Sequence, residues 1–357
     1  MSESQTRVNE PNIPLTQDLL KLIAEVDEFK GRWEALKNLS PDHLNALRKV
    51  ATVESVGSST RIEGAKLTDV QVETLLSNIQ MQKLDSRDEQ EVAGYAEAMD
   101  QIFQAFEDMH LTENHIRQLH QVLLRHSTKD ERHRGDYKKL ANNVVAIDAN
   151  GNEVGVIIET AQPFETPRLM EGLVRWTRKT VEEESMHPLL IVAVFTVQFL
   201  AIHPFQDGNG RLSRVLTTLM LLRAGYAYVP YASLESVVEE NKDIYYKSLR
   251  RTQTTLNSND PDWTPWIGFF LRCLKKQKDN LVKRLDREQS QVDKVKLPEL
   301  SLKILDLFET HDRLNLSKIE ELTGGNKNTI KVRLRELVNS GHISKHGKAR
   351  ATWYEVM

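Results

Sequence analysis

Residues 202–214 read IHPFQDGNGRLSR, and this stretch decides the interpretation of the chain. Before it, residues 189–200 form an almost continuous apolar run that predicts a buried helix. Pro204 ends that helix, because proline lacks an amide hydrogen and clashes with the preceding turn. The sequence GNG at residues 208–210 permits positive φ and a close approach of the backbone. A second amphipathic helix begins near Arg211, so a glycine-rich loop leads into a helix N-terminus.

This junction predicts an anion site, because free amide groups and the helix dipole both favour negative charge there. Arg211 and Arg214 lie three residues apart, on one face of the first turn, where cations are unfavourable unless a multiply charged anion binds. Asp207 is suited to a Mg²⁺ ion carried by phosphates, and His203 can accept a proton near neutral pH. The predicted chemistry is attack of a hydroxyl on a phosphate, without a P-loop or a Rossmann loop.

The composition bounds the class of protein. The chain has 357 residues, a formal net charge of −3 and one cysteine, which excludes a disulfide framework and a cysteine-based zinc site. No apolar run approaches the ~20 residues of a membrane-spanning helix, and the polar N-terminus has no apolar signal core. We therefore expect a soluble, cytoplasmic protein of two or three domains, without membrane contact.

The hydropathy pattern predicts an all-α fold. Apolar residues recur at helical spacing over residues 19–33, 44–56, 70–75, 92–106, 116–124, 170–176, 189–200, 215–222 and 263–274. Residues 142–160 break the pattern, since two β-branched runs flank Asn-Gly-Asn at residues 150–152 and predict a hairpin. Such a hairpin is either a binding element or surface decoration, and the sequence leaves both open.

The C-terminal part predicts a second domain. Residues 274–296 continue the last helix of the main domain into a linker, and three short helices and a hairpin follow at residues 300–310, 316–322, 326–339 and 341–355. This order is typical of a winged helix-turn-helix, with residues 326–339 as the recognition helix. Cations gather over residues 326–350, namely Lys327, Lys331, Arg333, Arg335, Lys345, Lys348 and Arg350. DNA binding is one interpretation, and a protein-contact or dimerisation role is favoured over it.

The stretch from His203 to Arg214 matches HPFx[DE]GNGRxxR at every defined position, and so resembles the Fic family of protein AMP-transferases. Fic domains are all-helical, with a hairpin called the flap that clamps the target segment; residues 142–163 correspond to it. The family commonly has adjacent prolines after the flap, where this chain has glutamine and proline at residues 162–163. The resemblance divides the chain into an N-terminal helical region, a catalytic domain, a linker helix and the winged-helix domain, at residues 1–99, 100–275, 276–297 and 298–357.

The resemblance also implies a role for each residue of the motif. His203 is the general base, Phe205 holds the loop, and Asp207 binds the Mg²⁺ that bridges the α- and β-phosphates of ATP. Arg211 contacts the β-phosphate and Arg214 the γ-phosphate. The implied contacts with ATP are made by Glu63, His203, Gly208, Asn209, Gly210, Arg211, Leu212, Ser213, Arg214, Tyr245 and Tyr246.

Tyr245 and Tyr246 correspond to a tyrosine pair that lines the adenine pocket in the family, since aromatic rings can sandwich a purine. The alternative is a core aromatic on an amphipathic helix. Asn241 and Gln253 are weaker candidates for adenine contacts. Histidines outside the motif, such as His120, are interpreted as structural.

Residues 59–64 read STRIEG and allow two interpretations. Thr60 and Glu63 fit a capping box, which would start a helix. The segment also resembles [ST]xxxE[GN], the inhibitory motif of the Fic family, with Ser59, Glu63 and Gly64 at its defined positions. In that case the Glu63 carboxylate pairs with Arg214, takes the donor meant for the γ-phosphate, and inhibits the enzyme within one chain.

The sequence thus predicts an autoinhibited protein adenylyltransferase that transfers AMP from ATP to Ser, Thr or Tyr hydroxyls of proteins, itself included, and releases pyrophosphate. One alternative is removal of AMP or transfer of another phospho-group. A second alternative is a DNA-binding regulator with a nucleotide-sensing domain. Exposed helical faces would permit a homodimer, but no seam identifies one.

Overall fold

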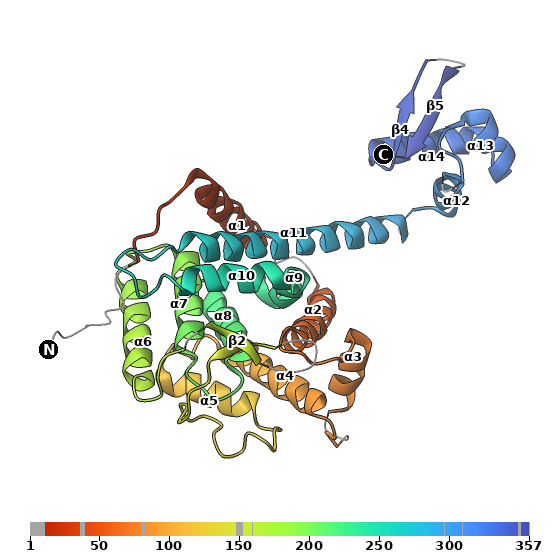
Figure 1. The fold of residues 1–357 in the computed structure, drawn as a ribbon. Coiled ribbons are helices and arrows are strands. Elements are labelled where there is room, and N and C mark those ends of the chain that lie inside the picture. Colours follow the sequence, from red (N-terminus) through yellow and green to blue (C-terminus); the bar gives the residue numbers. More distant parts are fainter. Residues whose placement is uncertain are drawn as a thin grey trace. The chain divides into compact units, whose positions relative to one another are not determined.

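The structure is a computed structural model, and it describes residues 11–35, 40–79, 83–147, 153–158, 160–295, 297–308, 310–348 and 351–356. The chain is mostly helical, so the predicted fold class is confirmed (Figure 1). It divides near residue 281 into two compact units. No helix within the described ranges is long and apolar enough to cross a membrane.

The first unit begins with five helices. They are α1 (Gln17–Ala35), α2 (Pro41–Ile62), α3 (Asp69–Asn78), α4 (Arg87–Ala105) and α5 (Glu113–Leu123). A side-chain hydroxyl caps the N-terminus of each of the last four, and α3 and α4 carry complete capping boxes. The predicted segment 44–56 is therefore part of a longer helix, which continues through residue 62.

The hairpin predicted between the helices is present as two antiparallel strands, β1 (Val144–Ile147) and β2 (Glu153–Ile158). Val145 lies opposite Val156. The predicted turn at residues 150–152 lies outside the described residues. The hairpin prediction is confirmed for the strands, while the flap function stays a prediction.

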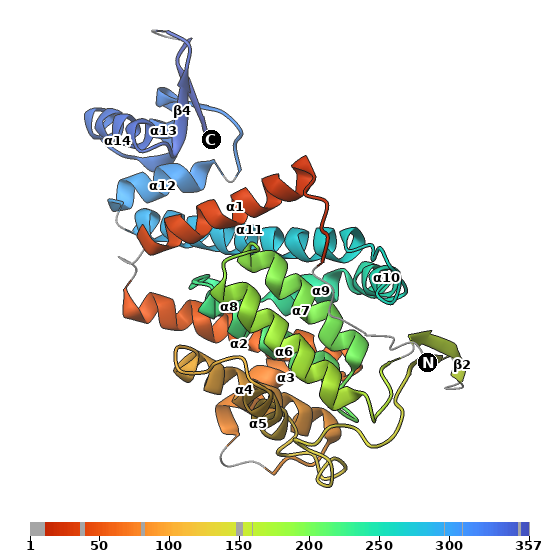
Figure 2. The same cartoon turned by 90° about the vertical axis from the view of Figure 1, so that its left-hand side faces the viewer.

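Two central helices position the site. They are α7 (Pro188–Ile202), which is buried along nearly its whole length, and α8 (Asn209–Arg223), which packs against it (Figure 2). Helix α6 (Thr166–Glu182) packs on the other side of α7. The loop between α7 and α8 is residues 203–208 and carries the motif, so two buried helices fix both of its ends.

The remaining elements of the first unit complete its wall around α7 and α8. They are the 3-10 turn η1 (Val229–Tyr231), the helices α9 (Leu234–Glu240) and α10 (Lys242–Gln253), and the first part of α11 (Thr264–Val295). Helix α11 continues past the division near residue 281 into the second unit. Gly225 follows α8 with φ of 84°, as a C-terminal cap requires. The short α9, which packs on α2, was not predicted, since seven residues show too little periodicity.

The second unit contains α12 (Glu299–Leu307), α13 (Leu316–Thr323), α14 (Lys327–Asn339) and the strands β3 (Leu314–Asn315), β4 (Ile343–His346) and β5 (Trp353–Val356). The three helices and the hairpin occur in the predicted order, and the short β3 adds an edge to the hairpin. Gly324 makes the predicted turn between α13 and α14 with φ of 64°. Isoleucine and leucine side chains from every one of these elements except β5 form the core, and Tyr354 of β5 packs against it.

Candidate active site

His203 is the C-cap of α7 and has a left-handed backbone with φ of 52°, which is rare for a residue other than glycine. Its amide donates to the Phe199 carbonyl at 2.9 Å, so the helical hydrogen bonding ends there. Burial lowers the pKa of His203 to about 4, and the nearby ammonium of Lys138 acts in the same direction. The imidazole is therefore neutral at pH 7 and able to accept a proton.

The loop after His203 is held by its own side chains. The Phe205 amide donates to Asn209 Oδ1 at 2.9 Å, and Asn209 Nδ2 donates to the Phe205 carbonyl at 2.7 Å. Gly208 precedes α8 with φ of 78°, a conformation that glycine adopts without strain. The loop is thereby closed into one conformation, which leads directly into the N-terminus of α8.

His120 on α5 is a structural residue, as interpreted from the sequence, and its specific role is to support this loop. Its ring stacks on Phe205 with centroids 3.8 Å apart. The Gly135 amide donates to its Nδ1 at 2.8 Å, so the other nitrogen, Nε2, carries the hydrogen and donates to the Asp207 carbonyl at 3.0 Å. Burial lowers the pKa of His120 to about 4, which keeps this neutral tautomer at pH 7. No sequence signal marks this histidine, because it lies 87 residues from Asp207.

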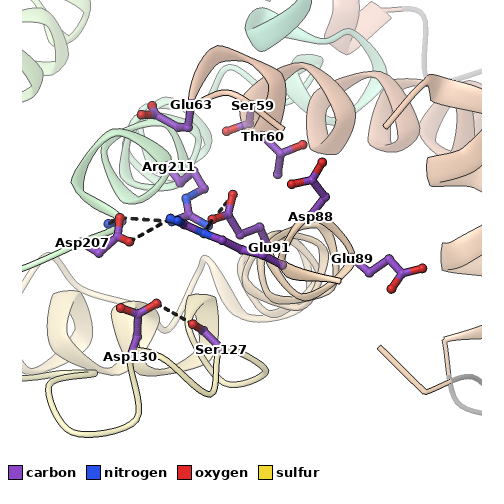
Figure 3. Close-up of polar contacts among 12 residues, drawn as sticks. Ser59, Thr60, Glu63, Asp88, Glu89, Glu91, Ser127, Asp130, Asp207 and Arg211 are labelled. Atoms are coloured by element: carbon purple, nitrogen blue, oxygen red, sulfur yellow. Dashed lines mark hydrogen bonds and ion pairs between the residues drawn. The ribbon is translucent and has the colours of Figure 1, made fainter. Parts of the chain in front are cut away.

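Four charged side chains form a ring beside the loop. Arg211, only 2% exposed, lies 3.3 Å from Glu91 Oε2 and 3.4 Å from Asp207 Oδ1, and Figure 3 shows the two carboxylates on different sides of it. Arg87 closes the ring, with 2.7 Å to Glu91 and 3.2 Å to Asp207. Arginine beside a helix N-terminus is therefore balanced here by the chain's own carboxylates.

Glu63 occupies the anion position that the sequence predicted at the start of α8. Its Oε1 accepts from Arg214 Nη2 at 2.8 Å, and a methyl group added to Gly210 would overlap its carboxylate. Ser59 holds the same guanidinium, because its Oγ accepts from Arg214 Nε at 2.8 Å and its carbonyl from Nη2 at 2.9 Å. Although burial disfavours the charged form of Arg214, the facing Glu63 raises its pKa overall.

The capping-box interpretation of residues 59–64 is wrong. Thr60 lies in the last turn of α2, and its hydroxyl donates to the carbonyls of Val56 and Gly57. Glu63 is the C-cap of α2, and Gly64 follows with φ of 108°. The segment ends a helix instead of starting one, which leaves the Glu63 side chain available to the facing helix α8.

Arg61 anchors this helix end, and the sequence analysis assigned it no role. Its guanidinium donates to both carboxylate oxygens of Glu239 on α9, at 2.7 and 2.9 Å. It also donates to Asp69 and to the Leu67 carbonyl, each at 2.9 Å. These contacts fix the C-terminus of α2, and with it the position of Glu63.

The tyrosine pair does not form a slot for a purine. The rings of Tyr245 and Tyr246 contact each other at 5.0 Å with planes inclined by 67°. Tyr245 is buried and packs against Trp266 and Phe269, which is the core role left open by the sequence. Tyr246 is 38% exposed, and its hydroxyl donates to the Ile62 carbonyl at 3.4 Å. Contact of either ring with adenine stays a prediction.

Two other residues predicted to contact ATP, Leu212 and Ser213, make contacts within the protein. Leu212 is buried in the core, and Ser213 Oγ donates to the Gly210 carbonyl at 2.7 Å. Among the weaker adenine candidates, Asn241 Nδ2 donates to the Val237 carbonyl at 2.8 Å, and Gln253 Nε2 donates to the Val197 carbonyl at 3.5 Å. Contact of any of these four residues with ATP stays a prediction.

Comparison with known families identifies the domain that carries the loop. Residues 110–221 match the Fic/DOC family. The chain contains a Fic domain. The match includes α5, the hairpin, α6, α7 and most of α8. Glu63, Arg87 and Glu91, which contact the motif from the end of α2 and from α4, lie before it.

Curated relatives and solved structures agree with this assignment. The chain is 28% identical over 270 residues to Protein adenylyltransferase Fic of Drosophila ananassae and of Drosophila melanogaster, which covers 74% of this chain. It spans about half the length of these curated relatives, 49% and 50%. A Fic domain-containing signaling protein from Bacteroides thetaiotaomicron has a TM-score of 0.59 and 25% identity, covering 75% of this chain and 96% of its own.

A Fic family protein from Desulfovibrio desulfuricans has a TM-score of 0.61 with 22% identity and covers 98% of both chains. At that identity the likeness concerns the fold. It extends over both units of the present chain.

Proposed function

We propose that the chain is an autoinhibited protein adenylyltransferase, with residues 100–275 as its catalytic domain. The intact loop, the neutral His203 and the relatives named protein adenylyltransferase support the transfer of AMP. The contact of Glu63 with Arg214 supports the inhibition, and it is the single observation on which that part of the proposal rests. The acceptors are protein hydroxyls, including those of the chain itself.

In the proposed reaction the acceptor oxygen attacks the α-phosphorus of ATP. A bond forms between that oxygen and the α-phosphorus, and the bond from the α-phosphorus to the bridging oxygen of the β-phosphate breaks. His203 takes the hydroxyl proton, and pyrophosphate leaves with the electron pair of the broken bond. Amide groups at the start of α8 and the buried guanidinium of Arg211 stabilise the charge on the phosphates.

The donors around the loop fit a triphosphate. Within the described residues, Nε of Arg211 and Nη1 of Arg214 are buried and donate no hydrogen bond. Asp207 is 29% exposed and would hold Mg²⁺ together with phosphate oxygens, as this ion prefers one or two carboxylates plus substrate phosphates. No cluster of three or more metal-ligating side chains occurs in the part of the chain that the structure describes, so the phosphates would have to complete the coordination. When bound, the ion supplies charge neutralisation between the phosphates.

The inhibition follows from charge. A γ-phosphate that reaches Arg214 has to displace the Glu63 carboxylate, which already accepts from that guanidinium at 2.8 Å. The two anions repel each other, so both cannot occupy the N-terminus of α8. ATP consequently binds weakly or in an unproductive orientation while Glu63 is in place.

The experiment is incubation of the purified protein with Mg²⁺ and ATP labelled on the α-phosphate, alone and with cell lysate. Wild type, Glu63→Gly, and Glu63→Gly combined with His203→Ala are compared. Label on protein only in the Glu63→Gly sample supports transfer, inhibition and the base together. Absence of label in all three, with ATP binding intact, refutes the transferase and favours AMP removal, which is tested by release of AMP from a modified protein.

The winged-helix assignment of residues 298–357 and the binding of DNA to residues 326–350 are separate predictions. Lys327 pairs with Glu320 at 3.2 Å and Arg333 with Glu336 at 2.7 Å, which reduces the basic character of α14. Lys331, Arg335, Lys345 and Lys348 are exposed. A shift assay on duplex DNA over a salt series tests this role, since phosphate contacts weaken steeply with salt.

A further inference from the structure

Lys138 lies in the segment between α5 and the hairpin, and it is buried with 3% of its surface exposed. Within the described residues no carboxylate offsets its charge, and burial lowers the pKa of its ammonium to about 8. Its Nζ instead donates to three neutral oxygens, namely Asn142 Oδ1 and Thr160 Oγ1 at 2.9 Å and the Ile202 carbonyl at 3.0 Å. Burial of an ammonium group without a counter-ion costs free energy, and the three hydrogen bonds offset part of that cost.

The three acceptors belong to three different segments. Asn142 precedes β1, Thr160 follows β2, and Ile202 is the last residue of α7, directly before His203. Lys138 therefore connects both ends of the hairpin to the start of the loop that carries the motif. Its own amide donates to the Pro204 carbonyl at 2.8 Å, on the other side of His203.

Neighbouring hydrogen bonds join the same three segments. Asn142 Nδ2 donates to the Phe205 carbonyl at 2.6 Å, and the Thr160 amide donates to Asn143 Oδ1 at 3.0 Å. Thr160 Oγ1 also donates to Asn142 Oδ1 at 3.2 Å. The two hairpin ends are thus joined to each other and to the loop around one ammonium group.

We propose that Lys138 is a positioning residue for AMP transfer, which fixes the hairpin against the loop so that an acceptor hydroxyl reaches His203 in line with the α-phosphate. The proposal rests on the proposed function above. A side chain with several donors is required here, because an apolar side chain of the same length would leave the Ile202 carbonyl and the Thr160 hydroxyl without this donor, and Asn142 Oδ1 with Thr160 as its remaining donor. Lys139, the next residue, is exposed and provides a matched control.

Lys138 has a second effect through its charge. The charged groups that act on His203 are Lys138, which disfavours the imidazolium, and Glu63 and Asp207, which favour it. Loss of the ammonium removes the one repulsion among them. The pKa of His203 then rises towards its ordinary value, and a larger fraction of the base is protonated in mild acid.

The test uses the full chain with Glu63→Gly as the active parent, and adds Lys138→Met, Thr160→Val or Lys139→Met. We expect Lys138→Met to slow protein labelling roughly 100-fold, since a displacement of about 1 Å has that effect on aligned groups. The Kd for ATP should stay within about twofold, because Lys138 contacts no predicted phosphate ligand. Thr160→Val should have a smaller effect of the same kind, and Lys139→Met none.

Two measurements separate positioning from general loss of structure. Hydrogen exchange of peptides covering residues 142–161 should be faster in Lys138→Met, and histidine NMR titration should give a raised pKa for His203. Labelling at the parent rate in both Lys138→Met and Thr160→Val overturns the proposal. If Lys138→Met does not fold, an unchanged rate in Thr160→Val overturns it. If the parent itself transfers no AMP, the proposed function fails, whereas exchange and titration still decide whether Lys138 fixes the hairpin.

Discussion

The contact between Glu63 and Arg214 leads to the prediction with the clearest magnitude. Glu63→Gln keeps the size of the side chain and removes its charge. The hydrogen bond of 2.8 Å joins a guanidinium that is 8% exposed to a carboxylate that is 32% exposed, so solvent screens it only in part. A hydrogen bond to a charged group is worth about 2 kcal/mol, and the glutamine amide oxygen can still accept from Arg214, so about half of that, ~1 kcal/mol, is lost. The weaker hold on Arg214 should therefore raise kcat/KM for labelling roughly 5-fold.

The assay measures self-labelling against ATP concentration, with calorimetry of ATP binding alongside. A lower Kd in Glu63→Gln indicates that the carboxylate excludes ATP, and an unchanged Kd with faster labelling indicates that it misorients ATP. Glu182→Gln is the control, because Glu182 is 70% exposed and its surface pair with Arg178 spans 3.9 Å. The reasoning is refuted if Glu63→Gln binds ATP but labels no faster than wild type, or if Glu182→Gln has an equal effect.

Further predictions concern the surroundings of the loop. Arg61→Gln removes the paired hydrogen bonds to Glu239 and loosens the end of α2, so labelling should rise several-fold, but less than in Glu63→Gln; an unchanged rate contradicts an anchoring role. The pKa of His120 is about 4 in the folded chain and about 6.5 when unfolded, so the unfolded state binds the extra proton between these values, and stability falls as the pH drops through this window. Urea unfolding should show about 2 kcal/mol of this loss at pH 5 relative to pH 7.5, and a His120→Asn variant that retains the whole loss would contradict it. Tyr95→Phe removes the donor at 2.9 Å from buried Glu235 and should lower the free energy of unfolding by about 2 kcal/mol, with a Tm at the wild-type value as the contrary result.

The helical class, the hairpin strands and the junction of loop and helix were predictable, because they depend on nearby residues. Pro204 and Gly208, which has φ of 78°, specify the local backbone whatever lies around them. Gly210 is instead helical, and a side chain there would overlap the Glu63 carboxylate. The continuous hydrophobic run of α7 likewise predicts a buried helix. The local pattern was ambiguous at residues 59–64, where both a capping box and the inhibitory motif matched. The capping box requires a helix to start there, whereas α2 ends at Ile62 with Glu63 as its C-cap.

The sequence by itself determined which chemical groups the loop and the start of α8 carry, since His203, Asp207 and the two arginines lie within twelve residues. The tertiary structure decided what meets that loop. Glu63 lies 151 residues before Arg214, and Lys138 and His120 reach residues 64 and 87 positions away. Such contacts depend on how α2 and α5 pack against α8, and burial then sets the charge of each group. Packing is a property of the whole core, so no local pattern encodes it.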